Sequence, residues 1–248
     1  MRPAGEAQWR PDPSFTRISL GRRILIAAPA IVRYAPELLV KLRELSSRPV
    51  SGEGNRASAT RIALPGGPEL IARRSRRGGM VSLVLAETFF GFRLRPFREL
   101  AASAEARRRG VAVAEPLGAL VEWLAPAVYR GWFLTRALNG MTLWDFIRHD
   151  DDPVVRGHVL LRARESVATM HNCGVFHADL NLRNLFVTQK GESFEVVILD
   201  LDKARIFDDP LPAKMRRANA ARLLRSARKL DPEGRYLDAA ALKVLDVG

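Results

Sequence analysis

One stretch of this sequence carries side chains suited to phosphoryl transfer. Residues 177–184 read HADLNLRN, which places Asp179 and Asn184 five positions apart, and Asp200 follows 16 positions later at the end of an apolar run. A carboxylate can orient an attacking hydroxyl and accept its proton, while an amide oxygen and a second carboxylate can hold magnesium, a hard cation that takes oxygen ligands. We therefore interpret Asp179 as the catalytic residue, and Asn184 and Asp200 as ligands of Mg²⁺, in a transfer from ATP.

The elements around this stretch are predicted by hydrophobic periodicity. Four apolar residues before it share one face of a helix that ends near residue 174: Leu160, Ala163, Val167 and Met170. Runs at 184–188 and 195–199, joined by a turn at 189–191, predict a hairpin. A helix, an H-x-D-x-x-x-x-N loop, a hairpin and a final Asp follow the order of the catalytic and metal-binding loops of the protein-kinase fold. Taken singly, Asp179 could be a cap and Asp200 a turn residue, but the combined order favours the catalytic interpretation.

The first half of the chain is predicted to be rich in strands and the second half rich in helices. The expected elements of the first half are short strands at 62–64 and 69–73, a helix at 97–109, and a strand pair at 117–124 and 129–135. A linker is expected near residues 135–140, and a last helix at 212–230.

Part of the first half is expected to hold a nucleotide. Arg73 ends a predicted strand and Glu99 lies on the next predicted helix, so we predict that the two form an ion pair that presents the cation to the phosphates of ATP. Arginine in this role offers planar, bidentate contacts where lysine offers a point charge. The alternative is that both are surface charges. Gly52 and Gly54 are a weaker match to a glycine loop that covers phosphates.

Several stretches together resemble the lipopolysaccharide-core kinases. They are ARRSRRGG at 72–79, FREL at 97–100, GVFHADLN at 174–181 and LDLDK at 199–203. The resemblance covers residues 50–232 and is greatest to the Kdo (keto-deoxy-octulosonate) kinases, with heptose kinases as relatives. The R-R-G-G and H-A-D-L-N stretches are much more specific than a generic kinase loop.

This resemblance implies an α+β, protein-kinase-like fold with two lobes. It divides the chain into an N-terminal extension that is partly helical (1–48), a strand-rich N-lobe that clamps ATP (49–136) and a helical C-lobe with the catalytic and metal loops (137–248). It also implies an ATP- and Mg²⁺-dependent kinase of a Gram-negative bacterium. Such enzymes phosphorylate an inner-core sugar of a lipid A-linked oligosaccharide at the cytoplasmic face of the inner membrane.

The family motifs map onto this sequence residue by residue. Asp179 matches the catalytic aspartate, Asn184 and Asp200 match the metal ligands, and Arg73 and Glu99 match the strand arginine and helix glutamate. The chain departs from the family at 74–75, where Arg-Ser replaces the usual His-Tyr pair.

The acceptor is expected to be small or lipid-linked rather than a folded protein. Ala178 stands where regulated protein kinases carry an arginine, and only 248 − 202 = 46 residues follow Asp202, without an A-P-E segment. The C-lobe therefore lacks the full peptide-substrate region. Arg76 and Arg77 are candidates for binding the acceptor, because the two glycines after them allow close backbone approach.

The net charge of the chain restricts the classes of partner that it is expected to bind. Forty Lys and Arg residues against 27 Asp and Glu residues give a net charge of +13, and the last predicted helix holds seven cations and no acid. Such charge suits an anionic membrane surface or an acceptor with phosphates and sugar carboxylates, although a solvated helix face is an equal alternative. We expect peripheral association with the membrane, no nucleic acid and no stable protein partner. One cysteine, Cys173, excludes an intrachain disulfide scaffold.

Two alternatives remain at this point. The first is another small-molecule kinase or an atypical protein kinase on the same fold, since a fold does not determine a substrate. The second is a pseudokinase that binds membrane or nucleic acid through its cations. The intact set of Asp179, Asn184 and Asp200 argues against the second alternative, because a binding module does not need it.

Overall fold

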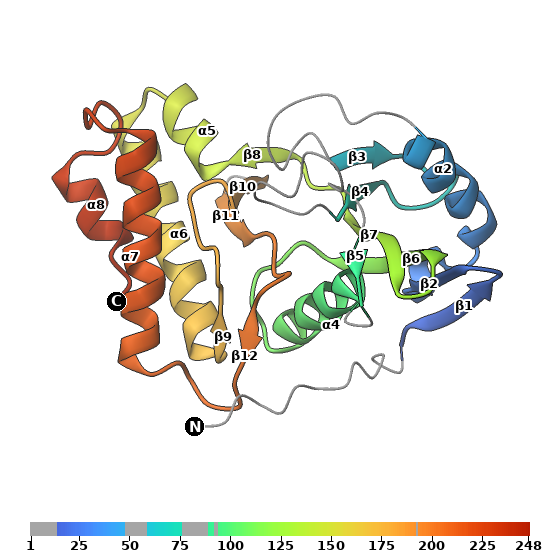
Figure 1. The fold of residues 1–248 in the computed structure, drawn as a ribbon. Coiled ribbons are helices and arrows are strands. Elements are labelled where there is room, and N and C mark those ends of the chain that lie inside the picture. Colours follow the sequence, from blue (N-terminus) through green and yellow to red (C-terminus); the bar gives the residue numbers. More distant parts are fainter. Residues whose placement is uncertain (1–13, 48–58, 76–88, 92–93, 192) are drawn as a thin grey trace. The chain divides into compact units, whose positions relative to one another are not determined.

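A computed structural model describes residues 14–47, 59–75, 89–91, 94–191 and 193–248 (Figure 1). Contacts divide the described chain into two units. The described residues between 14 and 104, together with 115–137, form the first, called here the sheet unit. Residues 105–114 and 138–248 form the second, called here the helical unit. The candidate catalytic residues all belong to the helical unit.

The sheet unit is built on one antiparallel sheet with the order β1-β2-β6-β7-β4-β3, and β5 also pairs with β7. The strands are β1 (Thr16–Leu20), β2 (Arg23–Ala27), β3 (Ala59–Ile62), β4 (Leu70–Arg74), β5 (Phe89–Phe90), β6 (Pro116–Ala125) and β7 (Val128–Arg136). The helices are α1 (Pro29–Val32), α2 (Ala35–Ser47) and α4 (Arg95–Arg108). The predicted strands and the helix at 97–109 are confirmed, with ends that differ by a few residues.

Both faces of this sheet are covered, because its central strands carry apolar side chains on each side. Leu25 of β2 joins a buried cluster with residues of α1 and α2, such as Leu38. The next residue, Ile26, points to the other face and joins a second cluster with Phe97 and Leu100 of α4. Alternation along a strand places successive side chains on opposite faces, so a strand buried on both sides is apolar throughout.

Residues 14–47 are part of this sheet unit. Along the sequence, residues 1–48 are expected to form an extension, whereas in the structure β2 pairs along its whole length with β6, with Ile24 opposite Val121. The short helices α1 and α2 then cover one face of the same sheet. The apolar run at 24–32 therefore contains most of the buried strand β2 and the whole of the short helix α1.

The helical unit carries the elements that surround the candidate site. Its helices are α5 (Leu143–His149), α6 (Pro153–Asn172), α7 (Ala213–Leu230) and α8 (Ala239–Leu245). Its strands are β8 (Gly140–Thr142), β9 (Val175–Phe176), β10 (Leu185–Lys190), β11 (Ser193–Ile198) and β12 (Arg205–Ile206). Strands β11, β10 and β8 form one small sheet, and β12 pairs with β9. The predicted long helix, hairpin and last helix are confirmed, as is the α+β class.

Helix α6 immediately precedes β9 and the loop that contains Asp179. Its N-terminus is capped by Asp152, whose side chain accepts hydrogen bonds from the backbone N–H groups of Val154 and Val155. It ends at Asn172, and Gly174, two residues further on, has a φ of +73°. A Cβ at this position would lie 2.3 Å from the carbonyl oxygen of Phe207, so only glycine fits the turn into β9.

Within the described residues, no helix combines the length and the apolar character needed to cross a membrane.

Candidate active site

His177 connects the loop at 177–184 to the end of β11. Its Nδ1 accepts a hydrogen bond from the backbone N–H of Asp179 at 3.1 Å, and its Nε2 lies 2.9 Å from the carbonyl oxygen of Leu199. Because Nδ1 accepts, the ring is neutral in this arrangement and Nε2 carries the proton that it donates to Leu199. His177 is therefore a packing and hydrogen-bonding residue of this loop.

The electrostatic surroundings of His177 keep it neutral. Burial lowers the pKa of this imidazole, and the hydrogen bond to Leu199 and the nearby carboxylates of Asp200, Asp179 and Asp202 offset only part of that effect. These carboxylates therefore lie around a neutral ring that orients the loop without taking up a proton itself.

Asn184 is positioned by the same loop. Its side-chain N–H donates to the backbone carbonyl oxygen of Asp179 at 2.8 Å. The backbone carbonyl oxygen of Asn184 accepts a hydrogen bond from the backbone N–H of Leu199, also at 2.8 Å. No hydrogen-bond donor from the described residues reaches its Oδ1, so this oxygen is available to a ligand. Asn184 thus links the two halves of the candidate site, the loop at 177–184 and the residues after β11.

The two carboxylates differ in how they are presented. Asp179 is exposed, and its side-chain oxygens accept no hydrogen bond from the described part of the chain. Asp200 has a φ of +64°, which among the described non-glycine residues is matched only by Ala127. A non-glycine residue held in this region costs about 1–3 kcal/mol, and such outliers cluster at functional sites. Asp200 therefore has a left-handed backbone conformation at the position that the sequence predicts to bind metal.

Asn219 of α7 also holds the loop, and the sequence interpretation missed it. Its side chain donates to the carbonyl oxygen of His177 at 2.6 Å, and its Oδ1 lies 3.3 Å from the backbone nitrogen of His177. The same Oδ1 lies 3.2 Å from Nε2 of His171. Asn219 is fully buried on the face of α7 that also carries Ala220, Leu223 and Ala227. An asparagine on the apolar face of an amphipathic helix was the signal that could have identified it, because a buried amide requires partners.

His171 completes this buried network. Burial lowers its pKa to about 4, and the positive charge of Arg216 acts in the same direction, while the hydrogen bond with Asn219 opposes both. Because Oδ1 of Asn219 can only accept, Nε2 of His171 carries the proton. His171 is therefore neutral near pH 7 and acts as a donor that fixes the orientation of the Asn219 amide.

The predicted ion pair of the sheet unit is present. The guanidinium of Arg73, on β4, contacts the Glu99 carboxylate, on α4, and the Glu99 side chain is only 4% exposed. Its neighbour Arg74, which departs from the family pattern, is buried, lies 4.8 Å from the ring of Trp132 and donates to the carbonyl oxygen of Leu45. Arg74 is thus a packing residue of the sheet unit.

Four predicted site residues lie outside the described residues. They are Gly52, Gly54, Arg76 and Arg77. Their assignments to phosphate and acceptor binding stay predictions from the sequence.

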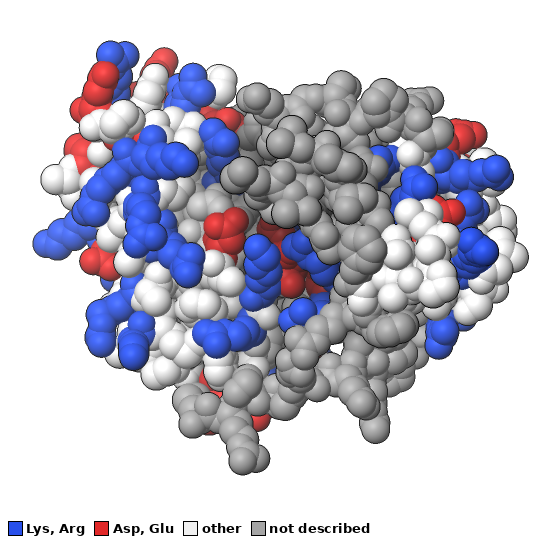
Figure 2. Space-filling model, in the orientation of Figure 1, with Lys and Arg blue, Asp and Glu red and all other residues white. Residues whose placement is uncertain are grey.

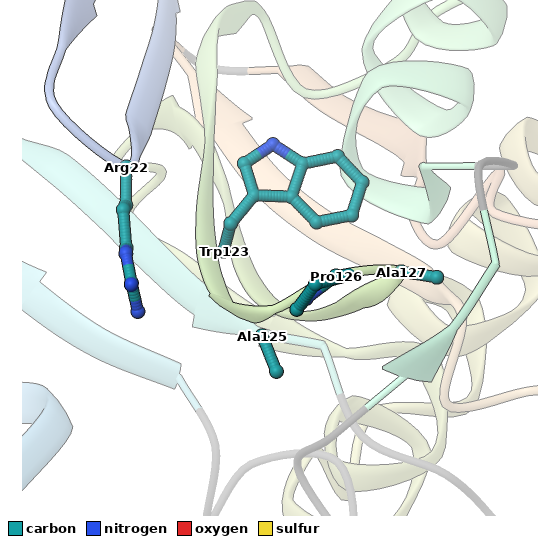
Figure 3. A pocket seen from close by; sticks show the side chains of 5 residues that line it. All are labelled: Arg22, Trp123, Ala125, Pro126 and Ala127. Atoms are coloured by element: carbon teal, nitrogen blue, oxygen red, sulfur yellow. The ribbon is translucent and has the colours of Figure 1, made fainter.

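A pocket of about 340 Å³ lies in the sheet unit, and none of the predicted site residues that the structure describes lines it (Figure 3). It is lined by Arg22, Trp123, Ala125, Pro126 and Ala127, which belong to the β1–β2 turn and the β6–β7 hairpin. One cation among apolar groups offers neither a general base nor oxygen ligands. This pocket therefore does not provide the chemistry of phosphoryl transfer.

Comparison with known families matches the chain to one of them. Residues 47–242 match the model of the lipopolysaccharide kinase (Kdo/WaaP) family. A 3-deoxy-D-manno-octulosonic acid kinase of Xylella fastidiosa (strain M23) is 31% identical over 198 residues, which cover 78% of this chain and 74% of that protein. The kinase of the same name from Xanthomonas campestris pv. campestris (strain B100) is 32% identical over 191 residues, or 74% of this chain and 71% of that protein.

Solved structures show the same fold. WaaP, solved in complex with acyl carrier protein, aligns with a TM-score of 0.52 at 18% identity and covers 89% of this chain and 95% of its own. The Rio2 kinase from Chaetomium thermophilum, solved as an ADP/Mg²⁺-phosphoaspartate complex, aligns with a TM-score of 0.50 at 11% identity, covering 94% of this chain and 72% of its own. The predicted protein-kinase-like fold is therefore confirmed.

Proposed function

The chain belongs to the lipopolysaccharide kinase (Kdo/WaaP) family and is a phosphotransferase, and we propose that it transfers the γ-phosphoryl group of ATP to an inner-core sugar of a lipid A-linked acceptor. Kdo is the favoured sugar because the similar proteins are named as 3-deoxy-D-manno-octulosonic acid kinases, and heptose is the second candidate. The observation on which the proposal depends is that the Asp179 carboxylate accepts no hydrogen bond from the described residues. Asn184 is held beside Asp179 because its side-chain N–H donates to the backbone carbonyl oxygen of Asp179.

Asp179 is the proposed catalytic residue. The acceptor hydroxyl donates a hydrogen bond to the Asp179 carboxylate, which orients the oxygen for in-line attack and accepts its proton as the new O–P bond forms. The bond between the γ-phosphorus and the β–γ bridging oxygen breaks, and ADP leaves with that electron pair. His177 positions Asp179 through the backbone N–H and stays neutral, so it does not compete for the proton.

Asn184 and Asp200 fit a magnesium ion. They offer an amide oxygen and a carboxylate, which are the hard oxygen ligands that Mg²⁺ prefers, and the Asn184 amide is turned so that its N–H is used and its Oδ1 remains available. When bound, the ion supplies positive charge that neutralises the phosphates. The role of the chain is to hold the two oxygens in place, through the backbone bond between Asn184 and Leu199 and through the turn at Asp200.

Arg73 is proposed to bind nucleotide phosphates. The buried carboxylate of Glu99 pairs with its guanidinium, and a planar guanidinium is suited to bidentate contacts with phosphate oxygens. Arg76 and Arg77 are retained as proposed contacts of the anionic acceptor.

We further propose that the enzyme acts as a peripheral protein at the cytoplasmic face of the inner membrane of a Gram-negative bacterium, where a lipid-linked acceptor is located. Its charge of +13 supports attraction to an anionic lipid surface.

The test is an incubation of the enzyme with labelled ATP, magnesium and a panel of Kdo- and heptose-containing lipid A acceptors, read by mass spectrometry. We expect one added phosphate on a Kdo-containing acceptor, lost in the Asp179→Asn variant. Absence of transfer to every acceptor, or transfer that the Asp179→Asn change leaves intact, contradicts the proposal. A small-molecule or atypical protein kinase would instead modify other acceptors under the same conditions.

A further inference from the structure

Helix α7 presents two faces with different chemistry. Its buried face carries Asn219, which holds the catalytic loop, together with Ala220, Leu223 and Ala227. Its exposed cations are Lys214, Arg217, Arg222, Arg225, Arg228 and Lys229, and the helix contains no acidic residue. Figure 2 shows Lys and Arg side chains gathered over this helix.

The six cations form one stripe rather than a ring around the helix. With 3.6 residues per turn they fall within an arc of about 140°, and they extend over about 22 Å of the helix axis. The residues between them on this arc, Ala218 and Ala221, are small and exposed. We call this surface the α7 stripe. Arg216 lies outside the arc, and its side chain donates instead to the carbonyl oxygen of Leu211.

The stability of the helix does not account for the α7 stripe. Lys214 lies in the first turn, at the positive end of the helix dipole, where cations are unfavourable and where the helix has no acidic residue. Arg222 and Arg225, like Arg225 and Arg228, are neighbours of like charge at a spacing of three. Within the described residues no ion pair joins any of the six cations to a carboxylate, whereas Arg73, Arg109 and Arg136 all have one. The cations of the α7 stripe can therefore bind an anionic partner outside the chain.

We propose that the α7 stripe is the surface by which the enzyme docks on an anionic lipid bilayer. This proposal rests on the proposed function, in which the acceptor is lipid-linked. A line of cations with only alanine between them binds headgroup phosphates by charge and does not insert into the acyl region. It also lacks the interleaved aromatic side chains on which single-stranded nucleic acids stack. Asn219, on the opposite side of α7, contacts the catalytic loop, so a bilayer on the stripe lies about one helix diameter, about 10 Å, from that loop.

The test compares two variants that lose the same charge. The stripe variant carries Arg222→Gln, Arg225→Gln, Arg228→Gln and Lys229→Gln. The control variant carries Arg17→Gln, Arg43→Gln, Arg107→Gln and Lys190→Gln, which are exposed cations of β1, α2, α4 and β10. Binding is measured by co-sedimentation of the full chain with vesicles that contain phosphatidylglycerol, with vesicles of phosphatidylcholine alone, and by titration with duplex DNA. The vesicles contain neither ATP nor acceptor, so a failure of the proposed reaction does not affect this measurement.

Wild-type protein is expected to bind the phosphatidylglycerol vesicles in a salt-dependent way and to ignore phosphatidylcholine. Each cation near an anionic surface contributes roughly fivefold to binding, so the stripe variant is expected to bind at least about 100-fold more weakly, whereas the control variant loses much less. A third variant, with Arg222, Arg225 and Arg228 each changed to Lys, keeps the charge and is expected to bind as wild type. Circular dichroism confirms that each variant is folded.

Three results overturn the proposal. The first is equal vesicle binding by the stripe and control variants, which would make the net charge alone responsible for vesicle binding. The charge-keeping variant binds as weakly as the stripe variant, which would assign the loss to helix α7 itself. Wild-type protein binds duplex DNA more tightly than it binds vesicles at equal phosphate concentration, which would assign the stripe to nucleic acid.

Discussion

Asp179 and Asn184 in the helical unit are positioned by backbone bonds to a buried network, whereas Arg73 and Glu99 in the sheet unit are positioned by each other. In the first case the reactive carboxylate remains open, because His177 and Asn219 hold the loop through main-chain atoms. In the second case the functional group of Arg73 is already partly engaged by Glu99. Under the proposed function, we therefore expect the helical unit to determine the chemical step and the sheet unit to contribute to binding. Substitutions in the two units should therefore separate into effects on kcat and effects on KM.

The largest effect is expected from Asp179→Asn. The amide keeps the size of the side chain but cannot accept the proton of the acceptor hydroxyl, so kcat should fall about 1,000-fold with little change in the KM for ATP. Steady-state kinetics of phosphate transfer measures both quantities. Asp151→Asn, an exposed acid before α6, is the matched control and should retain full activity. A loss confined to KM would move Asp179 out of the chemical step.

The second-largest effect on kcat is expected from Asp200→Asn. Asparagine tolerates a positive φ, so the turn at +64° is kept while the charge that holds magnesium is lost. We expect a loss in kcat of at least about 100-fold and a rise in the magnesium concentration needed for half-maximal activity, measured by magnesium titration. An unchanged magnesium requirement would remove Asp200 from the metal site.

Substitution of Asn219 tests whether the position of the loop at 177–184 depends on its contact with α7. Asn219→Ala leaves the N–H and carbonyl groups of His177 without their partner, so kcat should fall about 10- to 100-fold and the free energy of unfolding by about 1–3 kcal/mol. Asn172→Ala, at the exposed end of α6, is the control and should leave both unchanged.

A second variant separates positioning from stability. Asn219→Asp keeps the acceptor for the His177 N–H but places a carboxylate beside Nε2 of His171, so the pKa of His171 should rise well above its value of about 4. An NMR titration of His171 measures that shift. A purely structural role for Asn219 would lower the melting temperature of the alanine variant while its folded fraction kept wild-type kcat.

A smaller effect is expected from Arg73→Lys. Lysine keeps the charge opposite Glu99 but loses the planar, bidentate donor, so the KM for ATP should rise a few-fold, about three- to tenfold, with kcat nearly unchanged. An equal loss in kcat would show that the two units are not divided as described above.

The last prediction concerns the pH dependence of stability, an effect that is absent near pH 7. His171 has a pKa lowered to about 4 in the folded protein against an ordinary value of 6.5, so the unfolded chain binds the proton more readily between these values. The free energy of unfolding is therefore fully retained above pH 6.5 and decreases as pH falls from 6.5 towards 4, by up to about 1.4 kcal/mol per unit. Urea unfolding at several pH values measures the slope, and it should be smaller in His171→Gln. An equal slope in the variant would exclude His171 as its source.

The features that the sequence predicts correctly depend on local spacing. Periodicity is enough for α6, and the turn after residue 189 is enough for the β10–β11 hairpin. The loop, the hairpin and the turn that hold Asp179, Asn184 and Asp200 follow each other directly, so local spacing also predicts their order, while the roles of these three residues stay predictions. Arg73 and Glu99 could be paired because kinases pair a cation on a strand with a carboxylate on the next helix.

The features that sequence reasoning missed depend on distant contacts. Strand β2 pairs with β6, which follows it by about a hundred residues, so its apolar run is not recognisable as a central strand on local evidence. Asn219 contacts His177 from 42 positions away, and no spacing rule connects an amide in a late helix with an earlier loop. Both cases are decided by burial, which a single sequence indicates only indirectly.

The central claim is that the open carboxylate of Asp179 drives phosphate transfer to a lipopolysaccharide core sugar, and a single-turnover experiment tests it most directly. Enzyme in excess over a Kdo-containing lipid A acceptor is mixed with γ-labelled ATP and magnesium, and the labelled acceptor is followed over time for wild type, Asp179→Asn and Asp151→Asn. The account predicts rapid labelling by wild type and by Asp151→Asn, and labelling about 1,000-fold slower by Asp179→Asn. Equal rates for wild type and Asp179→Asn would contradict it.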